Sequence, residues 1–271
     1  MPSGFQLARR QAEAYDAHTG VFMDGSARLL ATGAAIGPGD AVLDLACGTG
    51  LVARHAAPLV TAGGRVVGVD INPAMLTVAR ERDPDAVEWI EAPCDALPFG
   101  DATFSHVICQ QGIQFFPDSL AALREVHRVL RPGGVVIATV WATPGRNPYI
   151  EHQLELLAEL DPTVVDSVRR ATPPMADLFL STSATGAGFD AIEVALLEHE
   201  VGVPDLATWF LAQTGGTPWG PTLAALGHDD RAALATRMVT ALAEYATSDG
   251  HRLPFASHRL HATRPNDASP T

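Results

Sequence analysis

The stretch Ala41-Val42-Leu43-Asp44-Leu45-Ala46-Cys47-Gly48-Thr49-Gly50-Leu51 decides the fold of this chain. It begins as an apolar run of the kind that forms a strand buried on both faces. It ends in two closely spaced glycines, where the chain turns sharply before a helix-like segment begins. A strand, a glycine turn and a helix in this order place free backbone N–H groups and bare Cα atoms against a ligand. The stretch therefore predicts a ligand site at the turn.

Strand and helix patterns then alternate as far as residue 141. Further strands are expected at residues 65–69, 87–91, 104–109 and 135–141, and helices at residues 72–82 and 118–130. Asn72 and Pro73 suit the N-cap and the first position of the earlier helix. The alternation predicts an α/β fold with a parallel sheet. Ligands bind such sheets at the carboxyl ends of the strands, and the ends expected to converge are residues 44–50, 70–72, 95–96 and 109–115.

The remaining segments are expected to enclose this sheet. Residues 5–35 look helical, with a break near Thr19 and Gly20. A proline-rich stretch, residues 143–180, surrounds an amphipathic helix at residues 148–160, and we interpret it as a cap over the active site. Two late strands, at residues 189–201 and 253–262, are expected to pair like a hairpin. Helical segments and a Gly/Pro loop at residues 215–220 lie between them in the sequence.

The length and composition indicate one large domain. The 271 residues are 47% hydrophobic, which is ample for a core, and no apolar run reaches the ~20 residues of a membrane helix. Within the domain we expect an N-terminal helical segment (1–35), a cofactor-binding core (36–141), the cap (143–180), C-terminal strands and helices (181–263) and a polar tail (264–271).

The chain is acidic, with a net charge of −13 from 18 Lys and Arg against 31 Asp and Glu. Nucleic-acid binding depends on clustered positive charge, so this balance argues against nucleic acid and against an anionic membrane surface. A neutral or cationic small molecule fits better, although solubility alone is a sufficient reason for acidity. The sequence contains no lysine, which excludes a P-loop and a Schiff base.

The cysteines and the N-terminus bear on the environment of the protein. Cys47, Cys94 and Cys109 lie in or beside apolar strand-like segments without metal-type spacing. We therefore expect no metal site and a reducing, cytoplasmic compartment. The N-terminal Met1-Pro2-Ser3-Gly4 lacks the charged and apolar regions of a signal peptide.

The glycine turn carries a nucleotide motif. Residues 48–53 match G-x-G-x-x-G/A, and Asp70 lies twenty residues after Gly50. A carboxylate at that position accepts hydrogen bonds from the vicinal hydroxyls of a ribose. The alternatives are a plain tight turn and a solvated aspartate at a strand end. If the motif binds a nucleotide, two ligands remain: a dinucleotide or S-adenosylmethionine (SAM).

Asp44 favours SAM over a dinucleotide. A pyrophosphate requires a helix N-terminus free of carboxylates, whereas Asp44 lies inside the strand, four residues before the first glycine. A carboxylate at that point would repel phosphate but suits the ammonium and sulfonium groups of SAM. Asp95, at the next strand end, could accept a hydrogen bond from the adenine amino group, or it could serve an Asx-turn.

Four motifs resemble those of class I SAM-dependent methyltransferases. Residues 42–50 (VLDLACGTG) resemble the first motif and residues 68–76 (GVDINPAML) the ribose-binding motif. Residues 92–104 resemble the adenine-binding stretch, and residues 125–139 the entry to the fifth strand. The likeness covers residues 15–141 and is nearest to the ubiquinone/menaquinone-biosynthesis-like group of small-molecule methyltransferases. Ser105 departs from the family pattern, which often has Asp there, but it lies away from the cofactor end.

The resemblance implies an architecture and a cofactor. The expected fold is a Rossmann-like, seven-stranded, mostly parallel sheet of order 3-2-1-4-5-7-6, with an antiparallel seventh strand and a helical cap. The expected cofactor is SAM, with S-adenosylhomocysteine as its product. The residues implied at the SAM site are Tyr15, Asp44, Ala46, Gly48, Thr49, Gly50, Asp70, Ile71, Met75, Asp95, Ala96, Gln110 and Gln111. Among them, Ile71 would pack on the adenine, and Gln110 and Gln111 would lie beside the methionine portion. Tyr15 would reach its carboxylate.

Methyl transfer requires alignment of a nucleophile with the methyl carbon and exclusion of water. A general base is needed only when the nucleophile must lose a proton, and histidine is the usual one at neutral pH. The candidates are His18 in the N-terminal segment and His152 in the cap helix, each with a surface or packing role as the alternative. Gln114 follows the fourth strand and could orient the acceptor.

The acceptor pocket is expected to contain Phe22, Gln114, Phe115, Phe116 and Trp141. Core packing is the alternative for the aromatic residues, but together with the apolar cap they favour a small, neutral, fairly hydrophobic acceptor of the natural-product or quinone type. Three functions remain open: O-, N- or C-methylation of such an acceptor, a non-methylating use of SAM such as a cyclase, and an NAD-type oxidoreductase. The sequence does not set the oligomeric state, and a homodimer is one option.

Overall fold

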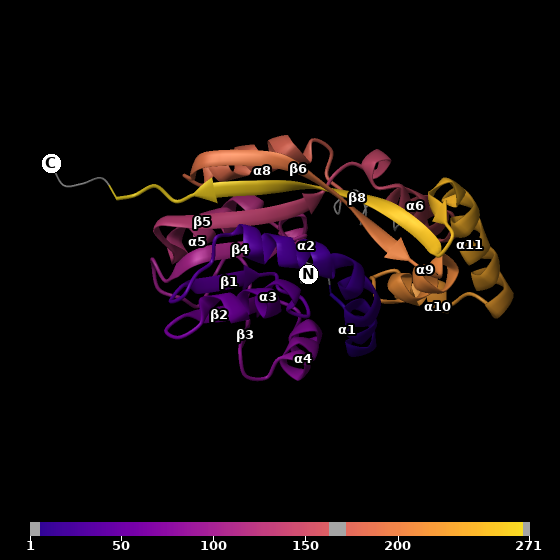
Figure 1. Cartoon of the computed structure of the whole chain (residues 1–271), viewed down its shortest axis with the longest axis horizontal. Coiled ribbons are helices and arrows are strands. Elements are labelled where there is room, and N and C mark those ends of the chain that lie inside the picture. The colour runs from indigo at the N-terminus through magenta and orange to yellow at the C-terminus, as the bar shows by residue number, and fades with distance from the viewer. Residues whose placement is uncertain (1–5, 163–171, 268–271) are drawn as a thin grey trace.

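A computed structural model describes residues 6–162 and 172–267 of the chain. Within these residues, the strands form a single sheet of order β3-β2-β1-β4-β5-β8-β6, and the two-residue β7 pairs with β8 (Figure 1). The strands are β1 (Ala41–Leu45), β2 (Arg65–Asp70), β3 (Glu88–Glu91), β4 (Phe104–Gln110), β5 (Leu130–Trp141), β6 (Asp190–Val203), β7 (Ala246–Thr247) and β8 (Gly250–Thr263).

The directions of the strands confirm the predicted topology. Strands β1 to β5 pair in parallel, whereas β8 is antiparallel to both β5 and β6. When the short β7 is left out of the count, β8 is the seventh strand, and the order is the 3-2-1-4-5-7-6 expected from the sequence. The predicted α/β fold with a mostly parallel sheet is therefore confirmed.

Helices cover both faces of the sheet. The helical elements are α1 (Arg9–Ala14), a π-helical turn (Tyr15–Thr19), α2 (Gly20–Gly33), α3 (Leu51–Val60), α4 (Pro73–Arg82), a 3₁₀ turn (Ile113–Phe115), α5 (Ser119–Val129), a 3₁₀ turn (Pro144–Arg146), α6 (Pro148–Leu160), α8 (Ala176–Gly186), α9 (Leu206–Gly215), α10 (Gly220–Ala224), α11 (His228–Ala241) and a 3₁₀ turn (Ala243–Tyr245). No helix in the described part of the chain combines the length and the apolar run needed to cross a bilayer.

The apolar run of β1 explains its central place. Leu43 and Leu45 are buried on one face of the sheet, in the cluster that contains Leu123 of α5 and Leu180 of α8. Val42 is buried on the other face, in a separate cluster that contains Val52 of α3. A strand that packs on both faces must be apolar at successive positions, which is the pattern that the sequence shows.

The segment that was expected to form the cap, residues 143–180, is divided between two parts of the structure. Helix α6 lies in a helical lobe that also contains α9, α10 and α11 and stands beyond the end of β5 (Figure 1). Residues 163–171, within the predicted cap, lie outside the described residues. Helix α8 packs on the sheet instead, because its buried Leu180 and Ala184 belong to the cluster beneath β8 and α5. Residues 176–180 are thus part of the sheet layer, and α9–α11 complete the cap.

The late strands connect the sheet to this lobe. They pair from Asp190 with Thr263 to Val203 with His251, so both are longer than the sequence predicted. Figure 1 shows the two strands running as one ribbon from the sheet to the helical lobe. The helices between them in the sequence are therefore carried to the carboxyl end of the sheet, where the ligand site was expected.

The N-terminal segment crosses the same end of the sheet. The break predicted near Thr19 and Gly20 is absent, and the π-helical turn joins α1 to α2 without interruption. Such turns place one extra residue in a helix and are frequent at functional sites. Here the turn contains Tyr15 and Thr19, both of which line the cavity described below.

Candidate cofactor and acceptor site

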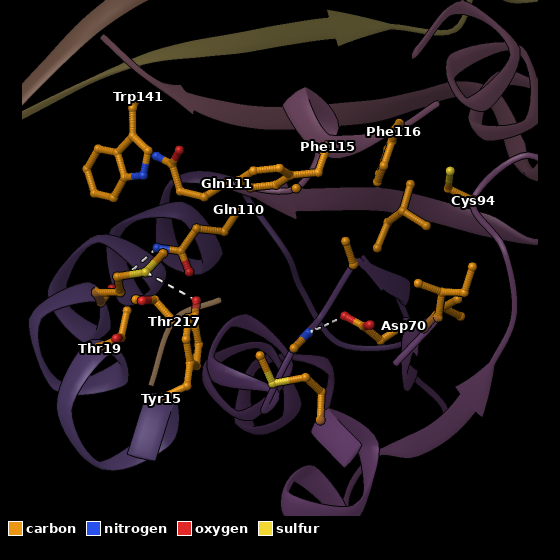
Figure 2. A pocket seen from close by; sticks show the side chains of 18 of the residues that line it. Tyr15, Thr19, Asp70, Cys94, Gln110, Gln111, Phe115, Phe116, Trp141 and Thr217 are labelled. Atoms are coloured by element: carbon orange, nitrogen blue, oxygen red, sulfur yellow. Dashed lines mark hydrogen bonds between the residues drawn. The ribbon is translucent and has the colours of Figure 1, made fainter. Parts of the chain in front are cut away.

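The ends of β1, β2, β4 and β5, the N-terminal segment and the helical lobe enclose a cavity of about 280 Å³ (Figure 2). This volume lies at the small end of the range for ligand pockets. Thirteen residues assigned from the sequence line it: Tyr15, Phe22, Ala46, Gly48, Asp70, Ile71, Met75, Asp95, Gln110, Gln111, Phe115, Phe116 and Trp141. The tertiary structure thus brings together residues from four strand ends and from the N-terminal segment.

Asp70 is held against the glycine turn at the end of β2. Its Oδ2 accepts a hydrogen bond from Gly48 N at 2.8 Å (Figure 2). Its Oδ1 accepts one from Asn72 N at 2.8 Å. Burial raises the pKa of Asp70, and the hydrogen bonds from the backbone of Asn72, Gly48 and Ile71 oppose this shift. Because Asp70 lines the cavity, its remaining lone pairs are directed to a site where hydroxyl groups of a ligand can donate to them.

Asp44 lines a second, smaller cavity beside the first, together with Thr49. Its Oδ2 accepts a hydrogen bond from Ala53 N, in the first turn of α3, at 2.9 Å. Burial raises the pKa of Asp44 to about 7, the bond from Ala53 opposes the shift, and the charge of Asp70 adds to it. The carboxylate therefore caps α3 and also faces a space that Tyr15 and Gln110 share with the larger cavity.

The two motif glycines have different roles. Gly48 adopts φ +54° and a Cβ placed on it would meet nothing within 4 Å, so its Cα faces open space in the cavity. Gly50 adopts φ +86° but lines neither cavity, and a Cβ on it would lie 2.2 Å from Cη2 of Trp89. This corrects the expectation that Gly50 lies against the cofactor: its bare Cα accommodates the indole.

One end of the cavity is formed by the segments that follow β2 and β3. Ile71, Met75 and Asp95 line it, as assigned from the sequence, and Cys94 joins them. Burial raises the pKa of the Cys94 thiol to about 12, so it remains neutral. Ala96, which the sequence placed beside Asp95, is exposed in the following turn and does not line the cavity.

The N-terminal segment is fixed between the sheet and the helical lobe. Gln110 Nε2 donates to Ser26 Oγ of α2 at 2.8 Å, which ties the end of β4 to this segment. On the other side, a Cβ on Gly216 would lie 2.5 Å from the backbone N of Tyr15, so only glycine fits there. Gln11 Nε2 also donates to Thr217 O at 3.0 Å. The Gly/Pro loop seen in the sequence is thus the contact that holds Tyr15 over the cavity.

The opposite end of the cavity is rich in aromatic side chains. Phe22 and Trp141 line it as predicted. Phe115 and Phe116 also line the cavity, and Figure 2 shows Gln111 between Trp141 and Phe115 and places Phe116 on the side of Cys94. Sequence reasoning missed five residues that the lobe supplies: Tyr149, Ile150, Gln153, Gln213 and Thr217. The local signals for these residues were the amphipathic pattern of residues 148–160 and the Gly/Pro loop. The position of the other lobe residues depends on how α9 and α10 fold back over the sheet, which no local pattern indicates.

Gln114 reaches the cavity only through a neighbour. The residue is 9% exposed and does not line the cavity, but its Nε2 donates to Gln111 Oε1 at 3.3 Å. Gln111 Nε2 in turn donates to Ser257 Oγ of β8 at 2.8 Å. Gln111 is held at φ +54°, a strained conformation for a side-chain-bearing residue. Gln114 is thus connected to the cavity through Gln111 and has no direct contact with it.

The two candidate histidines lie off the cavity. His152 Nδ1 pairs with Glu155 at 2.9 Å on the surface of α6, whereas Tyr149, Ile150 and Gln153 are the residues of α6 that line the cavity. The backbone carbonyl of His18 accepts a hydrogen bond from Trp209 Nε1 at 3.2 Å. In the described part of the chain, no histidine or arginine side chain lines the cavity. Neither candidate histidine therefore lies on the wall of the cavity.

The charge of the site fits SAM. Asp44, Asp70 and Asp95 line the two cavities, and the described lining residues offer no basic side chain to a pyrophosphate. Thr49 Oγ1 is buried and has no hydrogen-bond partner among the described residues, as expected where a further polar group completes the site. The open space at Gly48 admits a ligand against the backbone. A cationic ligand with hydroxyl groups satisfies these features, and a dinucleotide does not.

Comparisons with known proteins agree with this geometry. The family described as "Methyltransferase domain" matches residues 43–138. Over 171 residues the chain is 34% identical to the ubiquinone/menaquinone biosynthesis C-methyltransferase UbiE of Coxiella burnetii, covering 56% of this chain and 67% of that protein.

Two solved structures show the same fold. Phosphoethanolamine N-methyltransferase 2 of Haemonchus contortus, in complex with SAM, has a TM-score of 0.61 and 21% identity, and the match covers 96% of this chain and 58% of that chain. The [4+2]-cyclase SpnF has a TM-score of 0.55 and 21% identity, covering 98% of this chain and 88% of that chain. Together with the sequence relatives, the fold and the acidic cavity lead to one conclusion. The chain belongs to the class I SAM-dependent methyltransferases, in the group that resembles the ubiquinone and menaquinone biosynthesis enzymes.

Proposed function

We propose that this methyltransferase acts on a small, neutral, fairly hydrophobic acceptor of the natural-product or quinone type. The observation that carries the proposal is the composition of the lobe end of the cavity. Its walls are aromatic and aliphatic side chains, and the polar groups of the described lining residues at that end are neutral: the amides of glutamine, the hydroxyls of threonine and tyrosine, and the indole N–H groups of Trp141 and Trp219. A charged group on the methyl acceptor would be buried there without an opposite charge, which is energetically costly.

The acidic end of the cavity would hold SAM. We assign Asp70 to the ribose hydroxyls, Ile71 and Met75 to the adenine faces, and Asp95 to the adenine edge. Asp44 and Gln110 would lie by the methionine portion, where the carboxylate balances positive charge. When bound, SAM supplies a methyl group on a sulfonium that is already activated for displacement. The protein then has to align the acceptor and exclude water, which are effects worth several kcal/mol each.

The N-terminal segment and the helical lobe would exclude water from the reacting groups. Tyr15, Thr19 and Phe22 of the N-terminal segment and Tyr149 and Gln153 of the lobe cover the carboxyl ends of the strands. Burial raises the pKa of Tyr15, with the charges of Asp70 and Asp16 adding to the shift, so its phenol stays protonated at neutral pH. With no basic imidazole on the described lining, we infer that alignment, rather than an enzyme base, supplies most of the rate.

The names of the relatives help to rank the acceptors. UbiE is a C-methyltransferase of ubiquinone and menaquinone biosynthesis, and its name supports an aromatic acceptor for this enzyme. The Haemonchus contortus enzyme is named for phosphoethanolamine. A phosphorylated amine suits this cavity poorly, because the described lining residues include no cation to pair with a phosphate.

The test is a panel of acceptors offered with SAM to the purified full-length protein. The panel contains 2-naphthol, 2,7-dihydroxynaphthalene, a reduced naphthoquinone, phosphoethanolamine and a transcribed RNA, and S-adenosylhomocysteine is measured by mass spectrometry. Formation of S-adenosylhomocysteine with the neutral aromatic acceptors supports the proposal. Methylation of only phosphoethanolamine or RNA would overturn it. To test the cyclase alternative, a polyene substrate is included, and its conversion without S-adenosylhomocysteine would favour that function.

A further inference from the structure

A buried cluster of polar side chains lies where the helical lobe meets the N-terminal segment. It consists of Tyr149 and Gln153 on α6, Gln213 and Thr214 on α9, and Thr19 in the π-helical turn. Each of these residues is less than 10% exposed, and all but Thr214 line the cavity. Polar groups in such a position have to be satisfied by one another or by a ligand.

The hydrogen bonds within the cluster do not satisfy all of its polar atoms: one acceptor and one donor keep unused hydrogen-bonding capacity. Gln213 Oε1 accepts from Tyr149 Oη at 2.8 Å and from Gln153 Nε2 at 2.7 Å, which uses both of its lone pairs. Gln153 Nε2 gives a further bond to Thr214 Oγ1 at 2.9 Å. Gln213 Nε2 has one long contact, to Thr19 Oγ1 at 3.4 Å, and no described group donates to Gln153 Oε1.

The cluster therefore offers the cavity one acceptor, Gln153 Oε1, and one donor, an N–H of Gln213 Nε2. A polar atom enclosed without a partner is unfavourable, so a ligand group that satisfies both atoms gains affinity. A hydroxyl can donate to one atom and accept from the other through a single oxygen. A carbonyl or an ether can only accept, an ammonium can only donate, and a carboxylate can only accept.

We propose that Gln153 and Gln213 form a recognition site for a hydroxyl group of the methyl acceptor. The inference rests on the proposed function, since it takes the lobe end of the cavity to be the acceptor site. Thr19, which contacts this cluster, lies across the cavity from Asp70 in Figure 2. The recognised hydroxyl is thus an anchor of the acceptor on the side of the cavity opposite Asp70, and Gln153 and Gln213 are positioning residues that select it.

The cluster is rigid enough for such selection. Tyr149 is 1% exposed, and its ring packs on Trp209 with the centroids 4.7 Å apart. Both glutamines extend from helices of the lobe rather than from loops, and their partners Tyr149 and Thr214 come from the same two helices. An oriented pair of amides rejects a ligand that lacks the matching hydroxyl, because binding that ligand leaves Gln153 Oε1 and one N–H of Gln213 Nε2 without a partner.

The experiment compares two probes by calorimetric titration of the full-length enzyme saturated with S-adenosylhomocysteine. The probes are 2,7-dihydroxynaphthalene and 2-naphthol, which differ by one hydroxyl group. We expect wild-type enzyme to bind the diol at least about 10-fold more tightly, the fold-change that corresponds to one satisfied pair of buried groups. In Gln153→Met and in Gln213→Met the ratio is expected to fall below about 2-fold, while the affinity for S-adenosylhomocysteine is unchanged.

Leu156→Met is the matched control, because Leu156 is a buried residue of α6 that does not line the cavity. This variant should keep the wild-type ratio. Equal binding of the two probes by wild-type enzyme would overturn the recognition site even if both glutamine variants failed to fold. A ratio that persists in the folded glutamine variants would do the same. In both cases binding of the naphthols leaves the proposed function standing, whereas binding of neither probe overturns both.

Discussion

The indole of Trp89 lies directly on Gly50, so that a Cβ on Gly50 would come within 2.2 Å of Cη2. The same ring covers Gly68 of β2, where a Cβ would lie 2.4 Å from Cζ3. Trp89 Nε1 donates to Asp83 O at 2.8 Å, which fixes the ring in this position. The second glycine of the fingerprint is therefore required by packing, whereas Gly48 is the one that faces the cavity.

Gly50→Ala is expected to lower the free energy of unfolding by about 2–5 kcal/mol. The left-handed backbone costs an alanine about 1–2 kcal/mol, and overpacking against the indole costs about 1–3 kcal/mol. Gly48→Ala is the matched control, because it shares the positive φ but has nothing within 4 Å of the new methyl group. Urea unfolding of the two variants measures the difference. Equal stabilities would contradict the packing role, and Trp89→Leu should restore part of the loss in Gly50→Ala.

Asp70→Ala is expected to weaken SAM binding by about 1.5–3 kcal/mol, because two hydrogen bonds to a charged acceptor are lost. Isothermal titration with SAM measures the change. Glu91→Ala is the control, since Glu91 is the partner of Asp70 on β3 and is exposed outside the cavity. Because Asp70 also holds Gly48 N, urea unfolding of the variant separates a loosened turn from a lost contact. An unchanged affinity would mean that the ribose is held elsewhere.

Asp44 is expected to make the cofactor-free protein less stable as the pH rises from about 4 to 7. Its pKa is about 7 in the folded protein against 3.8 for an unperturbed aspartate, so the folded state binds more protons than the unfolded state within this window. Asp44→Asn removes the effect and should gain up to about 4 kcal/mol relative to wild type between pH 4 and pH 8. Urea unfolding over this range tests the prediction. The control is Glu88→Gln, because Glu88 is an exposed residue of β3. A pH-independent difference between wild type and Asp44→Asn would refute it.

The same carboxyl group should couple SAM binding to pH. The cationic groups of SAM favour ionised Asp44, so the affinity of wild-type enzyme is expected to increase from pH 6 to pH 8, through the pKa of about 7. Asp44→Asn should show a smaller increase, and the comparison cancels any titration of SAM itself. Identical pH profiles for the two proteins would show that Asp44 serves only as the cap of α3.

His18→Ala and His152→Ala are each expected to keep kcat within about twofold of wild type. Neither side chain lines the cavity, and surface substitutions of this kind usually change free energies by no more than about 0.5 kcal/mol. The measurement is S-adenosylhomocysteine formation with an acceptor from the panel. A loss of about 100-fold or more in either folded variant would restore a role for that histidine in proton transfer.

The strands and helices of the sheet and the residues at its carboxyl end were predictable because their signals are local, and the order of the strands followed from the resemblance to SAM-dependent methyltransferases. The apolar run of β1, the capping pair Asn72 and Pro73, and Asp70 at the end of β2 each identify an element or its end within a few residues. Asn72 does cap α4, accepting from Ala74 N at 2.9 Å. Parallel strands then bring their carboxyl ends to one edge, so that side chains far apart in the sequence meet without further information.

The acceptor end depended on contacts that no local pattern contains. Gly216 packs against the backbone of Tyr15, and Gln153 meets Gln213, only because the β6 and β8 ribbon carries α9 and α10 back over the sheet. Likewise, a glycine motif shows that the backbone must turn, but only the folded chain shows that Trp89 occupies the space beside Gly50. Local periodicity and turn chemistry determined the elements, and the resemblance of the motifs to those of SAM-dependent methyltransferases implied the order of the strands and the cofactor. The packing of distant elements determined which side chains surround the acceptor, because that choice depends on distances in space rather than on spacing along the chain.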